Sequence, residues 1–402
     1  MTVASVHDAI VVGGGPGGAA AALRLAQNGV RDVVLVDSAT FPRDKTCGSG
    51  LSPHALTIAD QLGFGDELRR RATPIDAVKI VTPGGRSFVL ASNAAAVVLL
   101  RREFDALIVH RAQSLGVKLA AGVRARALIK AGDRVVGVTL ADGRELRAHY
   151  VLCADGSHSI FSTDPRPKRS ISTLMGWWDD AEFTPRQIEM IFDREVAPLY
   201  GWLFPETSRR VNIGICIDGQ DADGQKTQRN VRTVFADFLE RHYARRLRGA
   251  TQLGPLKGHP IVYTTWIGHL TAPGALHLGE AARLTHNATG EGISQAMQSG
   301  IYAADAVARV LRGRVSEEAA WRDYVWQHRK RFTLGFVAGH AVRAIVSSPV
   351  LDAVAQLYEN PWVRRSVVRT LGSALAGTSV RDAGVAPRRA NDHANPASGA
   401  AP

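Results

Sequence analysis

The chain of 402 residues, with 45% hydrophobic and 21% charged residues, is long enough for one large or two medium hydrophobic cores and is typical of a globular protein. Its formal net charge of +12 would suit an anionic partner. The Arg and Lys residues are spread along the chain and no nucleic-acid-binding motif occurs, so we expect no nucleic-acid partner. The three cysteines are widely spaced, with no C-x-x-C and no paired histidines nearby, which favours neither a disulfide framework nor a metal site.

The first half of the chain also bears on location. The longest apolar run, residues 94–100, is far shorter than the roughly 20 residues of a membrane-spanning helix. The residues before the first predicted strand lack the basic and apolar regions of a secretory signal. We therefore expect a cytoplasmic location.

The N-terminal segment predicts a nucleotide-binding strand, turn and helix. Residues 8–12 form an apolar strand that leads directly into a G-x-G-x-x-G turn, and an Ala- and Leu-rich helix follows. The glycines of this turn are Gly13, Gly15 and Gly18. Such a turn brings backbone N–H groups and a helix N-terminus against a pyrophosphate. A second apolar strand, residues 32–36, ends at Asp37, the expected acceptor for ribose hydroxyls, so the pattern predicts an adenine dinucleotide.

Later segments predict that the same domain is assembled from separate parts of the chain. Residues 135–138 and 145–152 alternate apolar and polar around a turn at 141–143, which predicts an antiparallel meander inserted in a parallel sheet. Residues 275–278 predict a further strand. Apolar positions at helical spacing then predict a long helix from about 292 to 312.

Five ordered motifs carry the chemistry. They are P-R-x-K-x-C-G-x-G-L at 42–51, R-x-x-F-D at 101–105, A-D-G-x-x-S at 154–159, Y-G-W-x-F-P at 200–205, and G-E-A-A at 279–282 followed by T-G-E-G-I at 289–293. In this order the chain resembles the geranylgeranyl reductase family, within the p-hydroxybenzoate hydroxylase-like flavoproteins. The resemblance covers residues 8 to about 312. It implies an FAD-dependent oxidoreductase that reduces a carbon–carbon double bond of a lipophilic, isoprenoid-type substrate by hydride transfer from reduced flavin.

The expected fold is therefore α/β, with a Rossmann-type FAD-binding domain that carries the inserted meander. We expect this discontinuous domain at residues 1–159 and 269–316. Residues 160–268, with several strand-like runs, are expected to form a mixed-sheet substrate domain. A helical C-terminal region is expected at 317–385, and a disordered tail at 386–402.

The motifs and the resemblance together nominate the cofactor-binding residues. They are Gly13, Gly15, Pro16, Gly17, Gly18, Asp37, Ser38, Arg43, Cys47, Gly48, Arg102, Asp155, Gly279, Glu280, Gly290, Gly292 and Ile293. Arg102, with Arg101 as second choice, would clamp the pyrophosphate bidentately. The resemblance implies that Glu280 accepts hydrogen bonds from the ribityl hydroxyls of the flavin. The helix that begins at 289–293 would direct its backbone N–H groups at the flavin O2/N1 region. Asp155 either lies near the pyrophosphate or only shapes a turn.

Three residues are candidates for catalysis. By resemblance, Cys47 lies near flavin and substrate as a proton donor or positioning group, whereas a free cysteine can equally be a small packing residue. Trp202 and Phe204 alternate along one strand and so point the same way, either toward substrate or into the core. Glu291, in the turn that opens the long helix, is the third candidate.

The main alternative is a monooxygenase or halogenase-like tailoring enzyme, in which reduced flavin and O₂ form a C4a-hydroperoxide. Halogenases carry W-x-W-x-I-P where this chain has residues 200–205, and aromatic hydroxylases usually differ at 290–292, so both departures favour a reductase. A third reading is a flavoprotein with a structural or redox-sensing FAD. No second complete nucleotide cradle is visible, so NAD(P)H or a reduced protein is the expected electron donor.

The end of the predicted helical region could act outside the site. An apolar stripe within residues 363–375 runs beside Arg364, Arg365 and Arg369. Such a helix can lie on anionic lipid, which would give peripheral contact at the inner membrane surface, or it can pack on the substrate domain with a solvated basic face.

Overall fold

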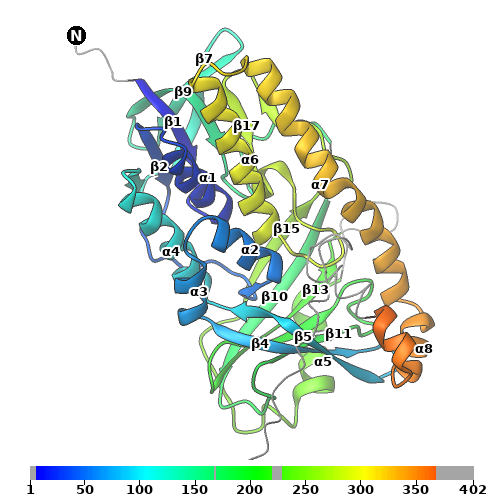
Figure 1. Ribbon diagram of the computed structural model, residues 1–402. Coiled ribbons are helices and arrows are strands. Elements are labelled where there is room, and N and C mark those ends of the chain that lie inside the picture. The colour runs from blue at the N-terminus through cyan, green and yellow to red at the C-terminus, as the bar shows by residue number, and fades with distance from the viewer. Residues whose placement is uncertain (1–5, 167–168, 220–228, 368–402) are drawn as a thin grey trace, which may run out of the picture.

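The structure is a computed structural model that describes residues 6–166, 169–219 and 229–367, and two β-sheets organise it (Figure 1). The first sheet follows the path β16-β17-β9-β1-β2-β6, and β7 and β8 attach to it through β9. Its strands are β1 (Val6–Val12), β2 (Val33–Asp37), β6 (Lys118–Ala121), β7 (Ala125–Ala131), β8 (Arg134–Leu140), β9 (Glu145–Cys153), β16 (Thr271–Ala272) and β17 (Ala275–His277). From β17 to β6 the neighbouring strands run parallel, as a Rossmann-type sheet requires.

The central strands form because they are continuous apolar runs buried on both faces. All five residues of β2 are buried, as is β1 from Ala9 to Val12. One face is covered by α1 (Pro16–Gln27), α4 (Arg101–Ser114) and α6 (Ile293–Leu311). The other face is covered by β7 and β8, which pair antiparallel with each other, and β8 also pairs antiparallel with the first part of β9. The predicted Rossmann-type domain with an inserted meander is thus confirmed.

Helices α1 and α6 cross at glycines. A Cβ atom placed on Gly300 would lie 2.2 Å from the carbonyl oxygen of Gly17, and one on Gly17 would lie 3.1 Å from the carbonyl oxygen of Ala296. The two backbones can therefore approach only because these positions lack side chains. This contact fixes the start of α6 beside the start of α1.

The second sheet contains nine strands along the path β14-β10-β13-β12-β11-β4-β5-β3, with β15 paired to β10. Its strands are β3 (Gly50–Leu51), β4 (Thr73–Val81), β5 (Ser87–Val98), β10 (Arg169–Asp179), β11 (Gln187–Ile191), β12 (Gly201–Pro205), β13 (Arg210–Asp218), β14 (Thr251–Gln252) and β15 (Lys257–Tyr263). Neighbours are antiparallel except β11 and β4, which run parallel.

Three strands of this second sheet differ from the sequence-based division of the chain. Strands β3, β4 and β5 lie within residues 1–159, the segment assigned to the FAD-binding domain, yet they pair in the second sheet. The parallel pairing of Gln187–Ile191 with Ala77–Val81 satisfies an edge that would otherwise be open. Local sequence patterns carry no signal for a pairing between segments so far apart.

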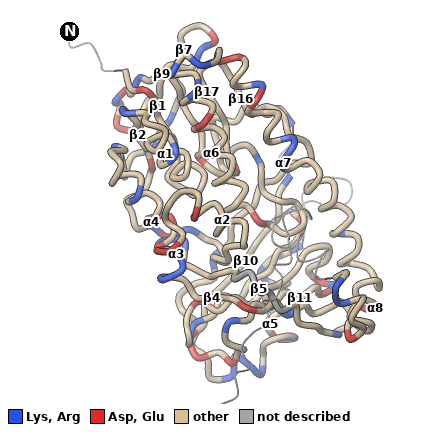
Figure 2. Tube along the Cα trace, in the orientation of Figure 1, with Lys and Arg blue, Asp and Glu red and all other residues tan. Residues whose placement is uncertain are grey.

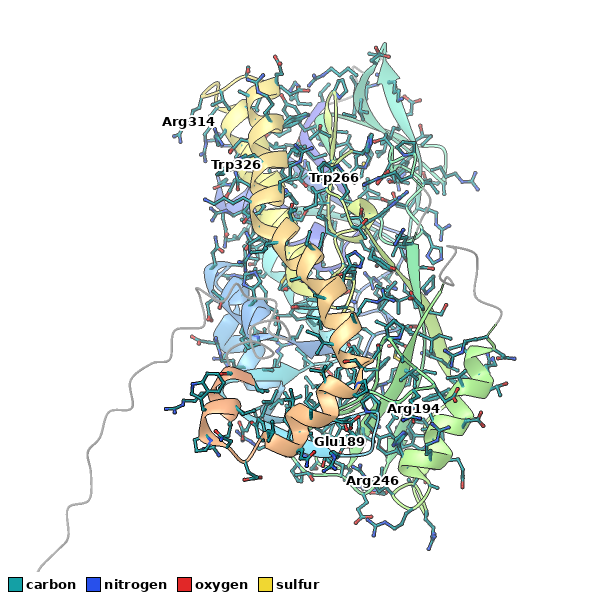
Figure 3. All side chains as sticks on the ribbon, turned by 90° about the vertical axis from the view of Figure 1, so that its right-hand side faces the viewer. Glu189, Arg194, Arg246, Trp266, Arg314 and Trp326 are labelled. Carbon is teal, nitrogen blue, oxygen red and sulfur yellow. The ribbon has the colours of Figure 1, made fainter. Side chains whose placement is uncertain are left out.

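The two faces of the second sheet have different partners. Helix α5 (Val231–Tyr243) packs on one face, where a Cβ on Gly201 would meet the ring of Phe238 at 2.0 Å. On this side, Arg246 pairs with Glu189 at 2.9 Å (Figure 3). The other face is covered by α7 (Glu317–Val346) and α8 (Pro349–Leu357), and α7 runs down the right-hand side of the molecule (Figure 1).

The helical C-terminus is confirmed as far as it is described. Shorter elements are α2 (Pro53–Gln61), α3 (Gly65–Arg71) and the 3₁₀ turn η1 (Gly279–Ala282). The rest of the expected helical region, 368–385, and the expected tail, 386–402, lie outside the described residues.

Gly300→Ala should destabilise the protein by about 1–3 kcal/mol, because the new methyl group would push α6 away from α1. Urea unfolding followed by circular dichroism measures this change. Gln298→Ala, two residues away on the same helix, should change stability by less than about 0.5 kcal/mol. Equal effects of the two substitutions would contradict the close crossing.

Candidate active site

The carboxyl ends of four parallel strands meet at one edge of the first sheet. Register pairs Val12 with both Val36 and Cys153, and Cys153 with His277, so the chain leaves β1, β2, β9 and β17 at the same level. The segments that follow are the glycine turn, Asp37, the loop after β9 and η1. Ligands of open α/β sheets bind at this edge.

The glycine turn leaves a gap of the right kind for a diphosphate. Gly13 has φ +98°, and a Cβ there would lie 2.4 Å from the carbonyl oxygen of Ala154. A Cβ on Gly18 would lie 1.8 Å from the carbonyl oxygen of Gly13. At Gly15, in contrast, the nearest atoms to a Cβ are guanidinium nitrogens of Arg43 at 3.8 Å and Arg101 at 3.9 Å. The turn is thus closed on two sides and open toward two positive charges, next to the first turn of α1, where Pro16 stands.

Asp37 is held in place at the end of β2. One carboxylate oxygen accepts the N–H of Gly14 at 2.7 Å and the other accepts that of Ala39 at 2.8 Å. The carboxylate is 8% exposed and therefore faces the cradle in a fixed orientation. This position suits ribose recognition. Ser38, the next residue, is exposed.

Arg101, and not Arg102, lies at the cradle. The Arg101 guanidinium donates two hydrogen bonds of 2.8 Å to the fully buried Asp105, which Arg43 also approaches at 3.2 Å. The Arg102 side chain is 51% exposed and lies 3.9 Å from Asp44. Consecutive helical residues point about 100° apart, so only one of the two arginines can face the cradle. The i,i+4 pair of Arg101 with Asp105 is the sequence signal that would have separated them.

The loop at residues 47–50 lies against the aromatic face of the second sheet. A Cβ on Gly48 would be 3.1 Å from both the Trp202 Nε1 and the Phe204 ring. Cys47 is half-buried, its Sγ accepts the N–H of Ser49 at 3.3 Å, and it also interacts with Arg101. The motif cysteine therefore lies between the diphosphate end of the cradle and the aromatic face.

Trp202 is part of the wall of this face. It is 4% exposed, and its Nε1 donates to Asn212 at 2.7 Å. Its ring also fills the space above Gly214, where a Cβ would lie 2.3 Å away. The sequence left open whether Trp202 points toward substrate or into the core, and the structure shows features of both. The indole lies on the face toward the loop at 47–50, and its N–H donates to a buried residue of the core.

Glu280 faces the positive groups of the cradle. Its carboxylate accepts the N–H of Val262 at 3.0 Å, and burial raises its pKa, against the opposing effect of Lys45 and Arg101. The preceding Gly279 has φ +59°, which lets η1 turn sharply behind the strand.

The turn that opens α6 is held from the second sheet. Tyr200 donates its hydroxyl proton to the carbonyl oxygen of Thr289, and Gly290 has φ +65°. A Cβ on Gly292 would lie 2.8 Å from the Thr285 Oγ1. Gly292 is also the N-cap and provides no side-chain cap, so the N–H groups of the first turn, which starts at Ile293, keep their positive field for a ligand.

Glu291 is a buried anchor between helices. Its Oε1 accepts hydrogen bonds from Ser52 at 2.5 Å and Ser294 at 2.6 Å, while Gln295 lies 3.5 Å from Oε2. Burial raises the pKa of this carboxyl, and the hydroxyls oppose that effect. The geometry thus ties α2 to α6, and a catalytic part for Glu291 stays a prediction.

Asp155 shapes the loop after β9. Its two oxygens accept hydrogen bonds from the Ser159 hydroxyl at 2.8 Å and the Ile160 N–H at 3.0 Å. The loop therefore starts in a fixed conformation beside Gly13, which is the turn role that the sequence left open.

A polar cluster at this junction was missed by the sequence analysis. His259 Nε2 accepts a hydrogen bond from Lys45 Nζ at 2.7 Å. His259 Nε2 also lies 2.8 Å from the Ser157 hydroxyl. Burial lowers the pKa of Lys45, and it lowers that of His259 to about 4, so His259 is neutral and accepts. The cluster joins β15 of the second sheet to two loops of the first. Lys45 and Ser157 belong to quoted motifs, but nothing in the sequence links them to His259.

A second unpredicted group is Glu206, directly after the Y-G-W-x-F-P segment. Alternation places it on the same face as Trp202 and Phe204. It is 7% exposed, Oε1 accepts the Trp177 N–H at 2.8 Å, and Oε2 has no hydrogen-bond partner among the described residues. Burial raises the pKa of Glu206 to about 7. The aromatic row therefore ends at a carboxyl that can hold a proton near neutral pH.

The comparisons with known proteins agree with this geometry. Residues 7–324 match the family model described as an FAD binding domain. A menaquinone reductase of Mycobacterium tuberculosis is 36% identical over 234 residues, which cover 54% of this chain and 56% of that protein, so the chain spans about half the length of this relative. A digeranylgeranylglycerophospholipid reductase of Methanoculleus marisnigri is 27% identical over 82% of this chain and 83% of its own length.

Two solved structures share the fold. A geranylgeranyl bacteriochlorophyll reductase-like protein of Thermoplasma acidophilum has a TM-score of 0.77 at 21% identity and covers 93% of this chain and 98% of its own. A flavin-dependent brominase also has a TM-score of 0.77, at 20% identity, and covers 93% of this chain and 94% of its own. The FAD-binding domain and the names of these relatives fit an FAD-dependent oxidoreductase. It belongs to the family defined by this FAD-binding domain and fits the geranylgeranyl reductase group that its motifs resemble.

Arg101→Gln should weaken FAD binding by at least about tenfold, or roughly 1.4 kcal/mol, because it removes a charge that faces the open side of the glycine turn. Arg102→Gln should leave FAD affinity unchanged. Titration of the apoprotein with FAD, followed by flavin fluorescence, measures both. Arg101→Lys, which keeps the charge beside Asp105, separates lost phosphate contacts from misfolding. A larger loss in Arg102→Gln than in Arg101→Gln would overturn the assignment.

The stability of the Glu206→Gln variant, measured relative to that of the native protein, should increase as pH rises. The folded-state pKa of Glu206 is raised above its unfolded value, so burying the carboxylate costs nothing below about pH 4.5 and costs most above pH 7. The full difference is on the order of 3 kcal/mol. Denaturant unfolding of both proteins between pH 5 and pH 8 measures it. A stability difference that stays constant over this range would rule out the raised pKa.

Proposed function

We propose that this protein uses reduced FAD to saturate a carbon–carbon double bond of a lipophilic, isoprenoid-type substrate. The observation that carries the proposal is the surface that faces the loop at 47–50. Beside it lies a cluster of buried apolar and aromatic side chains of the second sheet, which includes Tyr200, Trp202 and Met175. An apolar wall at the end of an FAD cradle suits a hydrocarbon substrate. Reductases of isoprenoid compounds among the relatives support the same conclusion.

The chain's own residues bind and orient the cofactor. Arg43 and Arg101 would neutralise the diphosphate, Asp37 would accept the ribose hydroxyls, and Glu280 would accept those of the ribityl chain. The N-terminus of α6 would stabilise negative charge at the O2/N1 side of the ring. Bound and reduced, FAD supplies the hydride, and the protein supplies position and dryness.

Cys47 is the proposed proton donor or positioning group for the second carbon of the alkene. It is the thiol of the loop that lies against the aromatic face, and it is only partly buried. The other cysteines are fully enclosed, and burial raises the pKa of both Cys153 and Cys216. Of the three thiols, Cys47 is therefore the one with access to a substrate.

Cys47→Ala should leave FAD content unchanged and lower turnover at least tenfold, which is about 1.4 kcal/mol of activation free energy. The FAD absorbance of the purified variant and its steady-state rate give the two readouts. Cys153→Ala, which removes a fully buried thiol packed under the meander of β7 and β8, is the matched control and should keep its rate. Unchanged turnover of Cys47→Ala would make Cys47 a packing residue.

A monooxygenase or halogenase-like activity is the second candidate, because a brominase shares the fold over nearly the whole chain. Its need for oxygen separates it from the first. The dithionite-reduced protein, mixed without oxygen with geranylgeranyl-type alkenes in a stopped-flow spectrometer, should recover the absorbance of oxidised flavin. If alkene has no effect and only oxygenated buffer reoxidises the flavin, the reductase proposal fails.

The electron donor and the location complete the proposal. NAD(P)H bound transiently or a reduced protein would supply electrons, and the protein would work in the cytoplasm, in peripheral contact with the inner membrane that holds a lipophilic substrate. The described parts of the chain contain no single helix that is long and apolar enough to cross a membrane. The basic helix predicted within 363–375 lies mostly outside the described residues.

A further inference from the structure

Large apolar side chains that face solvent gather on α7, on α8 and on the segment that follows α8. Of the twelve such residues in the described part of the chain, seven lie between Trp326 and Trp362. Leu334 is 77% exposed and Trp362 is 71% exposed. We call the following six residues the apolar face: Leu334, Val337, Ile345, Val350, Leu357 and Trp362. Exposed large apolar side chains that gather in one region mark a candidate interaction site.

Helix α7 is apolar on its outer side as well as on its inner side. Leu334, Val337, Ala341 and Ile345 recur every three or four residues, so they form one stripe along the exposed surface. The opposite stripe is buried, with Phe332, Phe336, Gly339, Arg343 and Val346. A helix that is apolar all round needs cover on both sides. The described residues 6–166, 169–219 and 229–367 cover only the inner side.

The charges around the apolar face are distributed in a distinct way. Between Arg331 and the end of α7 the sole charged residue is Arg343, which is buried and paired with Asp218. Figure 2 shows α7 without charged residues over most of its lower half. Exposed Arg329 and Lys330 lie before this stretch, and exposed Arg364 and Arg365 lie after it. Asp352 accepts hydrogen bonds from the Thr82 hydroxyl and the Gly84 N–H. Between Arg331 and Arg365, Glu359 is therefore the exposed acidic residue. The rim is therefore basic.

The two helices together have the apolar character of a membrane segment but not its path. As a pair, α7 and α8 pass the length and hydropathy test for a span, with an 80° bend at the break. Figure 3, however, shows α7 lying along the outside of the molecule with Trp326 on its upper half. Its inner stripe is packed into the protein core. The pair is thus positioned to lie on a bilayer.

We propose that the outer sides of α7 and α8 dock on an anionic lipid bilayer, with the apolar face inserted among the acyl chains and the basic rim at the head groups. Apolar residues flanked by Lys and Arg, with Trp at the ends, are the composition of an interfacial helix. A second copy of this chain would not use the basic rim, because the rim would face itself. The proposal deepens the proposed function and rests on it for the link to substrate, although docking itself needs no turnover.

Docking would also bring the bilayer next to the site. On their inner side, Val346, Leu351 and Tyr358 of these helices belong to the same apolar cluster as Tyr200 and Trp202. A single layer of helix therefore separates the apolar face from the aromatic wall of the candidate site.

Co-sedimentation of the full-length holoprotein with vesicles tests the docking. The protein should pellet with vesicles of phosphatidylglycerol and phosphatidylcholine, and Leu334→Glu with Val337→Glu should weaken this partition at least about tenfold. Leu115→Glu is the matched control, since Leu115 is 43% exposed at the end of α4, away from both helices. Equal partition of the native protein and the double variant would overturn the proposal.

Two further readouts identify the occupant. Arg364→Gln with Arg365→Gln should lower partition to the anionic vesicles and should have a smaller effect with pure phosphatidylcholine, where charge attraction is absent. In sedimentation velocity without lipid, the native protein and the double glutamate variant should have the same mass. Bilayer docking would be overturned if the native protein were a dimer that does not bind vesicles and the double glutamate variant were a monomer. That result would assign the apolar face to a second copy of the chain.

The outcomes for docking and for the proposed function are distinguishable. The double glutamate variant should keep its FAD absorbance and should reduce a detergent-dispersed alkene at the native rate, losing activity only with alkene supplied in vesicles. Normal alkene reduction without vesicle binding would overturn docking alone. Vesicle binding without alkene reduction would overturn the proposed function and leave docking supported.

Discussion

The site depends on one buried ion pair. Asp105 is fully buried and its carboxylate accepts two hydrogen bonds from the Arg101 guanidinium. The same carboxylate also lies close to Arg43. A carboxylate at 0% exposure is stable only with such partners, so it fixes both guanidinium groups where they face the gap at Gly15. Arg43 belongs to the loop that continues to Cys47, so the same pair also sets where that loop runs. The phosphate end and the reactive end of the candidate site are thus held by a single electrostatic constraint.

The second constraint is the junction of the two sheets. The loop at 42–51 ends in β3, which pairs with β5 of the second sheet, and Gly48 lies against Trp202. Lys45 of the same loop and His259 of β15 also join these two parts. Because the reactive face is made by one sheet and the cradle by the other, these contacts decide the distance between cofactor and substrate. Helices α7 and α8 close the face and turn their remaining apolar side outward, which connects the geometry of the site to the surface proposed for the bilayer.

What the sequence could predict follows the range of the interactions. The strand, glycine turn, helix and Asp37 were predicted because each signal lies within a few residues. The meander was predicted from alternation and a turn. The sequence favoured Arg102, whereas the structure places Arg101 at the cradle, because the choice depends on which side of a helix faces the cradle. The pairing of β4 with β11, the contact of Ser52 with Glu291 and the contact of Lys45 with His259 join segments at least about a hundred residues apart. Local patterns do not contain that information, and a single sequence gives no pairing signal.

The central claim is that the flavin of this protein saturates an alkene. Mass spectrometry of the product formed by the reduced holoprotein and a geranylgeranyl lipid, in the absence of oxygen, tests it most directly. The account predicts a product that has gained two hydrogen atoms for each reduced double bond, with one oxidised flavin formed in each turnover. A product that forms only in the presence of oxygen and has gained an oxygen or halogen atom would contradict the account.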